Sequence, residues 1–139
     1  MDKPLIMEFE YSAPLDDVWE AMTDAEKMRI WYFPQLREFE PRVGFEFKFA
    51  DSNDTYRKKW VVTKVEQPNT LAHNWSYQGY PGVSEVTFDL SPTDKGTRVS
   101  VTHTGLDSFP DAPHFKRERF EWGWDNLLGK NLSALLAKK

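Results

Sequence analysis

The sequence predicts an α+β protein in which an antiparallel sheet packs against a long C-terminal helix. A strand pattern and two short helical patterns come first, a series of alternating strand patterns fills the middle, and helical spacing of apolar residues closes the chain. The links between the middle strands are too short for helical crossovers, so neighbouring strands are expected to run antiparallel. Such a sheet has an apolar face to cover, and the last helix is long enough to cover it.

The N-terminal region predicts one strand followed by two helices. Apolar and polar residues alternate over residues 5–11, which is typical of a half-buried strand. A helix is expected to begin near Pro14, because proline suits the first helical turn. A second helix is expected from Thr23, whose spacing to Glu26 fits a capping box, and it should end before Pro34.

The middle of the chain predicts a meander of strands. Phe45, Phe47 and Phe49 alternate with charged residues, which places the three rings on one face of a strand. Turn residues then separate further strand patterns. These patterns cover residues 56–66, 71–77, 83–90 and 97–103.

From about residue 111 the apolar spacing becomes helical and predicts the long last helix. The residues on its apolar arc are Phe120, Trp124, Leu127, Leu128, Leu132 and Leu135. Phe115 and Trp122 fall near the opposite side of this arc. We therefore expect them to contact a loop, a short helix or a partner instead of the sheet.

Composition places the chain among ordinary globular domains, and we expect residues 1–139 to form a single domain. The net charge of −4 argues against nucleic acid as a partner. The chain has no cysteine, which excludes disulfides and thiolate chemistry. The N-terminal residues hold no apolar run long enough for a signal peptide or a membrane span, so we expect a cytoplasmic protein without a membrane partner.

Several short motifs resemble one family over nearly the whole chain and in the same order. They are Ala13-Pro-Leu-Asp-Asp-Val-Trp19, Thr23-Asp24, Trp31, Gly44-Phe45-Glu46-Phe47, Leu71-x-x-x-Trp75 and Gly123-Trp124. The chain resembles homologues of the C-terminal domain of the activator of heat-shock protein 90 ATPase, in the START-like, or polyketide-cyclase-like (SRPBCC), superfamily. The resemblance implies a β-α-α-β6-α helix-grip fold with a curved antiparallel sheet, often with an apolar cavity under the last helix. START-like relatives carry lipids or hormones or cyclise polyketides, and the chaperone activator stimulates an ATPase as a two-domain protein.

The same alternation turns aromatic residues of several strands toward the last helix, where they can line a ligand pocket. The predicted ligand-binding residues are Phe47, Trp60, Trp75, Tyr77, Phe88, His103 and Trp124. An ordinary packed core explains the same pattern, and the sequence leaves both interpretations open. Tyr77 and His103 end inward-facing alternations, so each is expected to present a polar tip in apolar surroundings.

No cofactor, metal site or catalytic residue is predicted. The three histidines lack the close spacing of metal ligands. The acidic stretch 51–54 does not continue as an EF-hand loop, which needs glycine at its sixth position and glutamate at its twelfth, where this chain has Tyr56 and Val62. Residues 79–82 lack the lysine and glycine spacing of a phosphate-binding loop.

The sequence therefore predicts a domain that binds a small hydrophobic or aromatic molecule, with two alternatives left open. One is a co-chaperone-like module that binds a chaperone or a second copy of itself. The apolar loops 31–36, 79–83 and 106–115 are candidates for that surface or for the mouth of a cavity. The other is a cyclase-like enzyme acting on a ligand in the cavity, with Tyr77 or His103 as acid or base.

Overall fold

The computed structural model describes residues 4–34, 36–49, 60–76 and 81–137. Its strands are β1 (Leu5–Tyr11), β2 (Leu36–Glu38), β3 (Lys48–Phe49), β4 (Val62–Glu66), β5 (Thr70–Trp75), β6 (Ser84–Thr93) and β7 (Gly96–Thr104). Its helices are α1 (Leu15–Thr23), α2 (Ala25–Trp31), α3 (Arg117–Trp124) and α4 (Ser133–Ala137). This order confirms the predicted α+β class and the β-α-α-β6-α arrangement.

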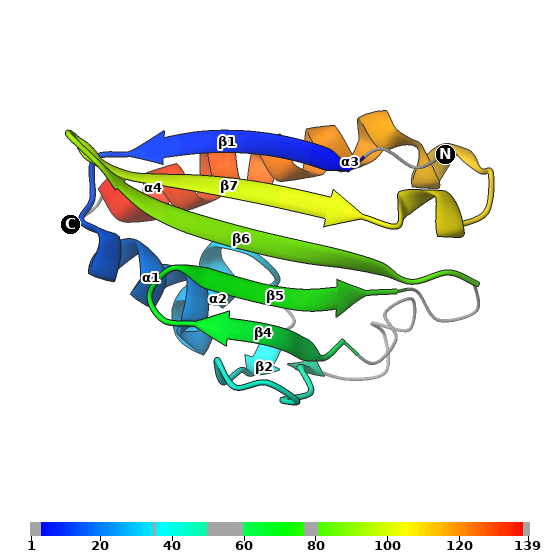
Figure 1. Ribbon diagram of the computed structural model, residues 1–139, viewed down its shortest axis with the longest axis horizontal. Helices are drawn as coiled ribbons and strands as arrows, with labels where there is room; N and C mark the ends of the chain where they lie inside the picture. The colour runs from blue at the N-terminus through cyan, green and yellow to red at the C-terminus, as the bar shows by residue number, and fades with distance from the viewer. Residues whose placement is uncertain (1–3, 35, 50–59, 77–80, 138–139) are drawn as a thin grey trace.

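The main sheet is antiparallel and has the strand order β1-β7-β6-β5-β4 (Figure 1). Each of β4 to β7 pairs with its neighbour in sequence, as expected for a meander with short turns. β1 instead pairs with β7, from Leu5 opposite His103 to Tyr11 opposite Thr97. The first and last strands of the fold therefore lie side by side.

The predicted strand over residues 45–49 is divided between two pairings. Glu46 forms a β-bridge with Val61, and the Phe47 backbone N–H donates to the Trp60 carbonyl at 2.9 Å. The residues that follow, β3, pair with β2 instead and form a small second sheet with it. The inward alternation is confirmed for Phe45 and Phe47, which are both buried.

The start of α2 differs in detail from the predicted capping box. Asp24, not Thr23, is the N-cap, and its Oδ2 accepts a hydrogen bond from the Lys27 backbone N–H at 3.2 Å. Thr23 belongs to α1, where its hydroxyl donates back to the Trp19 carbonyl. Both residue types satisfy helix-terminal groups locally, and the chain places the bend one residue later than expected.

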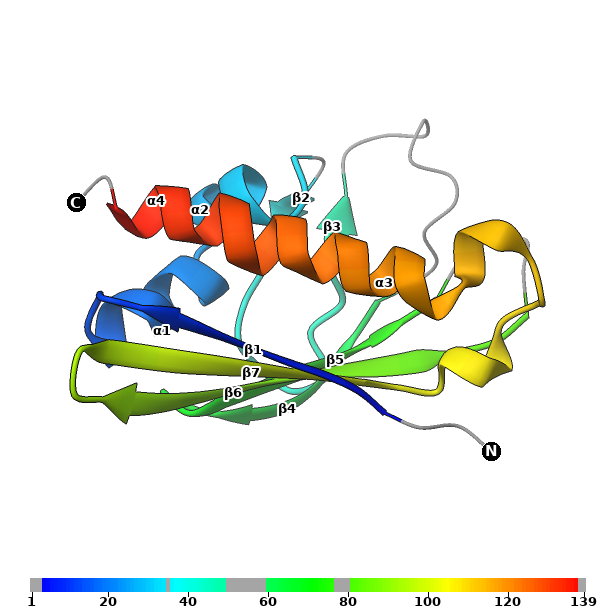
Figure 2. The same cartoon turned by 90° about the horizontal axis from the view of Figure 1, so that it is seen from above.

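The last helix runs from Arg117 to Ala137 and lies across one face of the main sheet (Figure 2). It begins later than predicted, because Pro113–Phe115 forms a separate 3-10 turn and Lys116 is extended. Between α3 and α4, residues Asp125–Leu132 wind as a π-helix. Within the described parts of the chain, no helix is long and apolar enough to cross a membrane.

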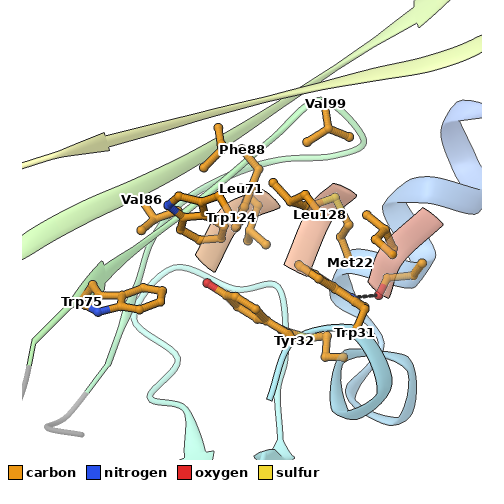
Figure 3. Packing of buried hydrophobic residues seen from close by; sticks show 14 of the residues in the cluster. Met22, Trp31, Tyr32, Leu71, Trp75, Val86, Phe88, Val99, Trp124 and Leu128 are labelled. Atoms are coloured by element: carbon orange, nitrogen blue, oxygen red, sulfur yellow. Dashed lines mark hydrogen bonds between the residues drawn. The ribbon is translucent and has the colours of Figure 1, made fainter. Parts of the chain in front are cut away.

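The core lies between the main sheet and the helices, with α1 and α2 on the same side as the last helix (Figures 2 and 3). Its members in Figure 3 include Met22, Trp31, Leu71, Val86, Phe88, Val99, Trp124 and Leu128. Side-chain hydrogen bonds also join the last helix to the other layers. The buried Tyr11 hydroxyl donates to the Leu128 carbonyl at 2.7 Å, and the Asn131 side-chain amide donates to the Trp31 carbonyl at 3.3 Å.

Candidate functional site

Six of the predicted ligand-binding residues converge between the sheet and the last helix. Trp75, Phe88 and His103 come from β5, β6 and β7, and Trp124 comes from α3. Phe47 and Trp60 lie on two further segments, and the backbones of these segments pair with each other. The seventh, Tyr77, lies outside the described residues. We call the six residues that converge the aromatic cluster.

The rings of the aromatic cluster are buried and contact one another directly. Their exposed fractions lie between 0% for His103 and 8% for Trp75. The ring centroids of Trp60 and Trp75 are 4.4 Å apart, and those of Trp75 and Trp124 are 5.6 Å apart. Such distances are those of contacting aromatic pairs. A bound molecule therefore has to lie beside these pairs or displace a ring from them.

Three residues outside the predicted ligand-binding set also belong to this region. Tyr32, at the end of α2, stacks on Trp124 with a centroid distance of 6.1 Å. Phe33 contacts Trp60 and Trp75, and His73 stacks on Trp60 at 5.5 Å. The aromatic run before Pro34 signals Tyr32 and Phe33 in the sequence, but its position in a loop favours a cavity mouth or a surface for a second copy of the chain.

His103 lies at the centre of a hydrogen-bond chain that determines which of its two ring nitrogens carries the proton. The Trp124 indole N–H donates to its Nδ1 at 3.2 Å, so Nδ1 carries no proton. The neutral ring then carries its proton on Nε2, which donates to the Ser84 hydroxyl oxygen at 2.8 Å. Ser84 in turn donates to the Trp75 carbonyl at 3.2 Å. In this tautomer His103 cannot take a proton from Ser84, so the pair is not arranged as a nucleophile with its base.

His73 has the opposite tautomer, which again follows from its partners. Its Nδ1 lies 2.7 Å from the Asn74 carbonyl oxygen, and a carbonyl only accepts. The proton is therefore on Nδ1, and Nε2 accepts the Tyr32 hydroxyl hydrogen at 2.9 Å. This side-chain pair links the end of α2 to β5.

Burial keeps both histidines neutral near pH 7. Loss of solvation lowers the pKa of His73 to about 4, although the Asn74 hydrogen bond acts in the other direction. Loss of solvation, helped by the nearby His73, lowers the pKa of His103 to about 3. The described residues also include no group of three or more His, Cys, Asp or Glu side chains that could hold a metal ion.

A small hollow lies near one end of the aromatic cluster. It has a volume of about 230 Å³ and is lined by residues of the segment 106–116, among them Phe109 and Phe115. The Phe109 ring stacks on Phe120, which in turn contacts His103 at 5.2 Å. The predicted contact of Phe115 with a loop is confirmed, since its ring stacks on Phe109.

Comparisons with solved structures support the fold. MLL2253 from Mesorhizobium loti matches with a TM-score of 0.77 and 24% identity over 99% of this chain and 98% of that one. BH1534 from Bacillus halodurans matches with a TM-score of 0.76 and 24% identity over 96% of both chains. CalU16 from Micromonospora echinospora matches with a TM-score of 0.73 and 25% identity, over 96% of this chain and 74% of that one. Among curated proteins, none matches the sequence.

A family comparison identifies the sequence relationship. The sequence model for Activator of Hsp90 ATPase homolog 1-like protein matches residues 12–137, from the end of β1 to the end of α4. This confirms the resemblance on which the helix-grip expectation was based. The chain belongs to the Activator of Hsp90 ATPase homolog 1-like protein family.

Proposed function

We propose that this protein binds a small hydrophobic or aromatic molecule between the main sheet and the last helix. The proposed contact residues are Phe47, Trp60, Trp75, Tyr77, Phe88, His103 and Trp124. The convergence of aromatic rings from separate elements supports this proposal most directly. Large flat side chains with a few placed polar groups are typical of small-molecule sites.

The electrostatics of the site favour a neutral ligand. Both histidines are neutral near pH 7, and among the described residues no Asp, Glu, Lys or Arg is buried. A buried ionic ligand would therefore lose its hydration without gaining a counter-charge. Binding is driven by burial of apolar area, at about 25 cal/mol per Å² before the costs of association are subtracted.

The first experiment is native mass spectrometry of the purified protein, followed by denaturing extraction. We expect an additional mass that leaves the protein on denaturation and that belongs to a neutral, apolar compound. If the protein is purified empty, a panel of neutral aromatic compounds is tested by thermal shift and calorimetry. An empty protein that also ignores this panel contradicts the proposal.

A pair of variants locates the binding site. Trp75→Leu removes a ring from the middle of the aromatic cluster and should weaken ligand binding about tenfold or more, because a large contact surface is lost. Trp122→Leu is the matched control, since this tryptophan lies on the last helix and is 65% exposed. Equal effects of the two substitutions would argue against a site between the sheet and the last helix.

A second candidate function is binding of a protein partner through the outer side of the last helix. Trp122 is the observation that favours it, because an exposed tryptophan next to arginine is typical of an interface contact. The Arg119 guanidinium lies 5.9 Å from the Trp122 ring. Purified chaperone should bind the wild-type protein and bind Trp122→Ser less tightly. Equal binding of both proteins, or no binding of either, excludes this surface as the contact.

A further inference from the structure

A hollow of about 530 Å³ lies beside α1, between this helix and two loops. One loop is the turn between β4 and β5, which Figure 1 shows curving next to α1, and the other joins β2 to β3. The residues of the hollow used below are Asp16, Trp19, Glu20 and Thr23 from α1, with Pro41 and Gln67 from the loops. None of them belongs to the aromatic cluster, so the hollow is separate from the proposed site under the last helix.

The helical repeat of α1 brings four of these side chains onto one face. Asp16 and Glu20 are four residues apart, and so are Trp19 and Thr23. Side chains three or four positions apart are neighbours on a helix surface. The face therefore places two carboxylates next to an indole and a hydroxyl group.

The indole N–H of Trp19 has no hydrogen-bond acceptor among the described residues. The side chain is only 5% exposed, and Nε1 is its one polar atom. The indole N–H groups of Trp31, Trp60 and Trp124, in contrast, each donate to an acceptor of the protein. Buried N–H groups of folded proteins almost always have a partner. Because Trp19 lines the hollow, an oxygen held in the hollow can supply the missing acceptor.

The rim of the hollow is acidic. Asp16, Asp17 and Glu20 line it, whereas none of the described Lys or Arg residues does. Lys27 offsets part of this charge through its 2.8 Å contact with Glu20, and like charges at the spacing of Asp16 and Glu20 repel each other. No three acidic or histidine side chains of the described residues are grouped so that they could hold a metal ion. The remaining charge therefore suits an organic cation.

We propose that this hollow binds small hydroxylated amines. The ammonium group lies between Asp16 and Glu20 and relieves their repulsion, and a hydroxyl oxygen of the same molecule accepts the Trp19 N–H. A hollow of this volume is within the range of small-molecule sites. Because both carboxylates are exposed, each charge contact contributes little. Removing either the charge or the hydroxyl from the ligand should therefore weaken binding by about fivefold.

The test compares three compounds of one shape by nuclear magnetic resonance of the wild-type protein. The probes are aminocyclohexanol with its two groups on neighbouring carbons, cyclohexylamine, which lacks the hydroxyl, and cyclohexanediol, which lacks the charge. Aminocyclohexanol should move the Trp19 indole N–H signal downfield until it saturates, with an affinity about fivefold above that of either other compound. A signal that does not move, or equal affinities for the three compounds, would overturn the inference.

Three variants assign the effect to the hollow. Trp19→Phe identifies the indole signal by its loss and should lower aminocyclohexanol affinity to that of cyclohexylamine. Asp16→Asn should lower aminocyclohexanol affinity about threefold and leave cyclohexanediol binding unchanged. Glu118→Gln removes an exposed carboxylate from α3 and is the control, which should change neither. The other indole signals report whether each variant is folded. Full affinity in Trp19→Phe, or equal losses in Asp16→Asn and Glu118→Gln, would contradict the proposed contacts.

Discussion

The indole nitrogen of Trp124 lies 3.2 Å from Nδ1 of His103, and this contact joins the last helix to β7. It is also the contact that determines the His103 tautomer. The Ser84 hydroxyl completes the chain on the far side of the imidazole. A change at Trp124 is therefore expected to affect packing and hydrogen bonding together.

Trp124→Phe should destabilise the protein by about 2–4 kcal/mol. It leaves Nδ1 of His103 without its donor in a buried position and also removes part of a packed ring. Trp122→Phe is the control on the same helix and should change stability by less than about 0.5 kcal/mol, since that side chain is largely exposed. Urea denaturation measures both. Similar losses for the two variants would contradict the role given to the Trp124 contact.

Stability should fall as the pH is lowered from about 6.5 toward 4. In the unfolded chain histidine takes up a proton near its ordinary pKa of 6.5, whereas folding lowers the pKa of His73 to about 4 and that of His103 to about 3. Within this window the unfolded state binds more protons, so each histidine should cost about 1.4 kcal/mol per pH unit. At neutral pH the imidazoles are unprotonated in both states, so no stability is lost there. Urea denaturation at a series of pH values measures the slope.

A histidine variant separates this effect from other titrations. In His73→Phe the slope between pH 6 and 4 should decrease by about half, because one of the two buried imidazoles is gone, even though the variant is less stable overall. A slope that is unchanged in this variant, or a wild-type stability that is constant over this range, would show that the histidines are not buried in the neutral form.

Gly123→Ala should stabilise the protein by about 1 kcal/mol, the difference in helix propensity between the two residues. Gly123 lies in α3, and apart from its chain neighbours and the backbone of its own helix, no heavy atom of the described residues would lie within 4 Å of an added methyl group. Gly129→Ala is the contrasting change in the same helix, where the methyl would lie 3.3 Å from the Phe9 ring and 3.2 Å from an Asp125 carboxylate oxygen. It should give no gain. Thermal denaturation compares the two, and a gain at Gly129 equal to that at Gly123 would contradict this packing.

Tyr11→Phe should cost about 1–2 kcal/mol. The hydroxyl donates to the Leu128 carbonyl at 2.7 Å in a buried position, and burial raises the pKa of Tyr11. Its removal leaves a carbonyl of the π-helical segment with one partner fewer. Chemical denaturation measures the loss, and hydrogen exchange should show faster opening of residues 125–132 than of β6. Unchanged stability would mean that water replaces the hydroxyl.

Local periodicity was sufficient to predict most of the sheet and much of the aromatic cluster. Val86, Phe88 and Leu90 share the inward face of β6 because side chains of a strand alternate, whatever lies opposite. The same argument placed Trp75 and His103 correctly, and the helical repeat placed Trp124 and Leu128 on one apolar arc. These residues meet because each apolar face has to be covered by another.

Features that depend on a distant partner were not predictable in this way. The 45–49 segment alternates as a strand, but its pairing changes from residues 60–62 to β2, and no local pattern specifies that change. The position of Tyr32 depends on where α2 ends and on His73, far along the chain. Hydrogen-bond direction at His73 and His103 follows from single carbonyl and indole partners, which residue types alone do not identify.

The pairing of β1 with β7 has a consequence for the order in which the protein folds during translation. Leu5 leaves the ribosome well before its partner His103, which lies 98 residues further on, a distance that takes about 5–20 s to synthesise. The last helix, which covers the same face, is made later still. The first strand thus waits unpaired until the seventh is complete, so a nascent chain interrupted before β7 would expose an apolar face to other proteins.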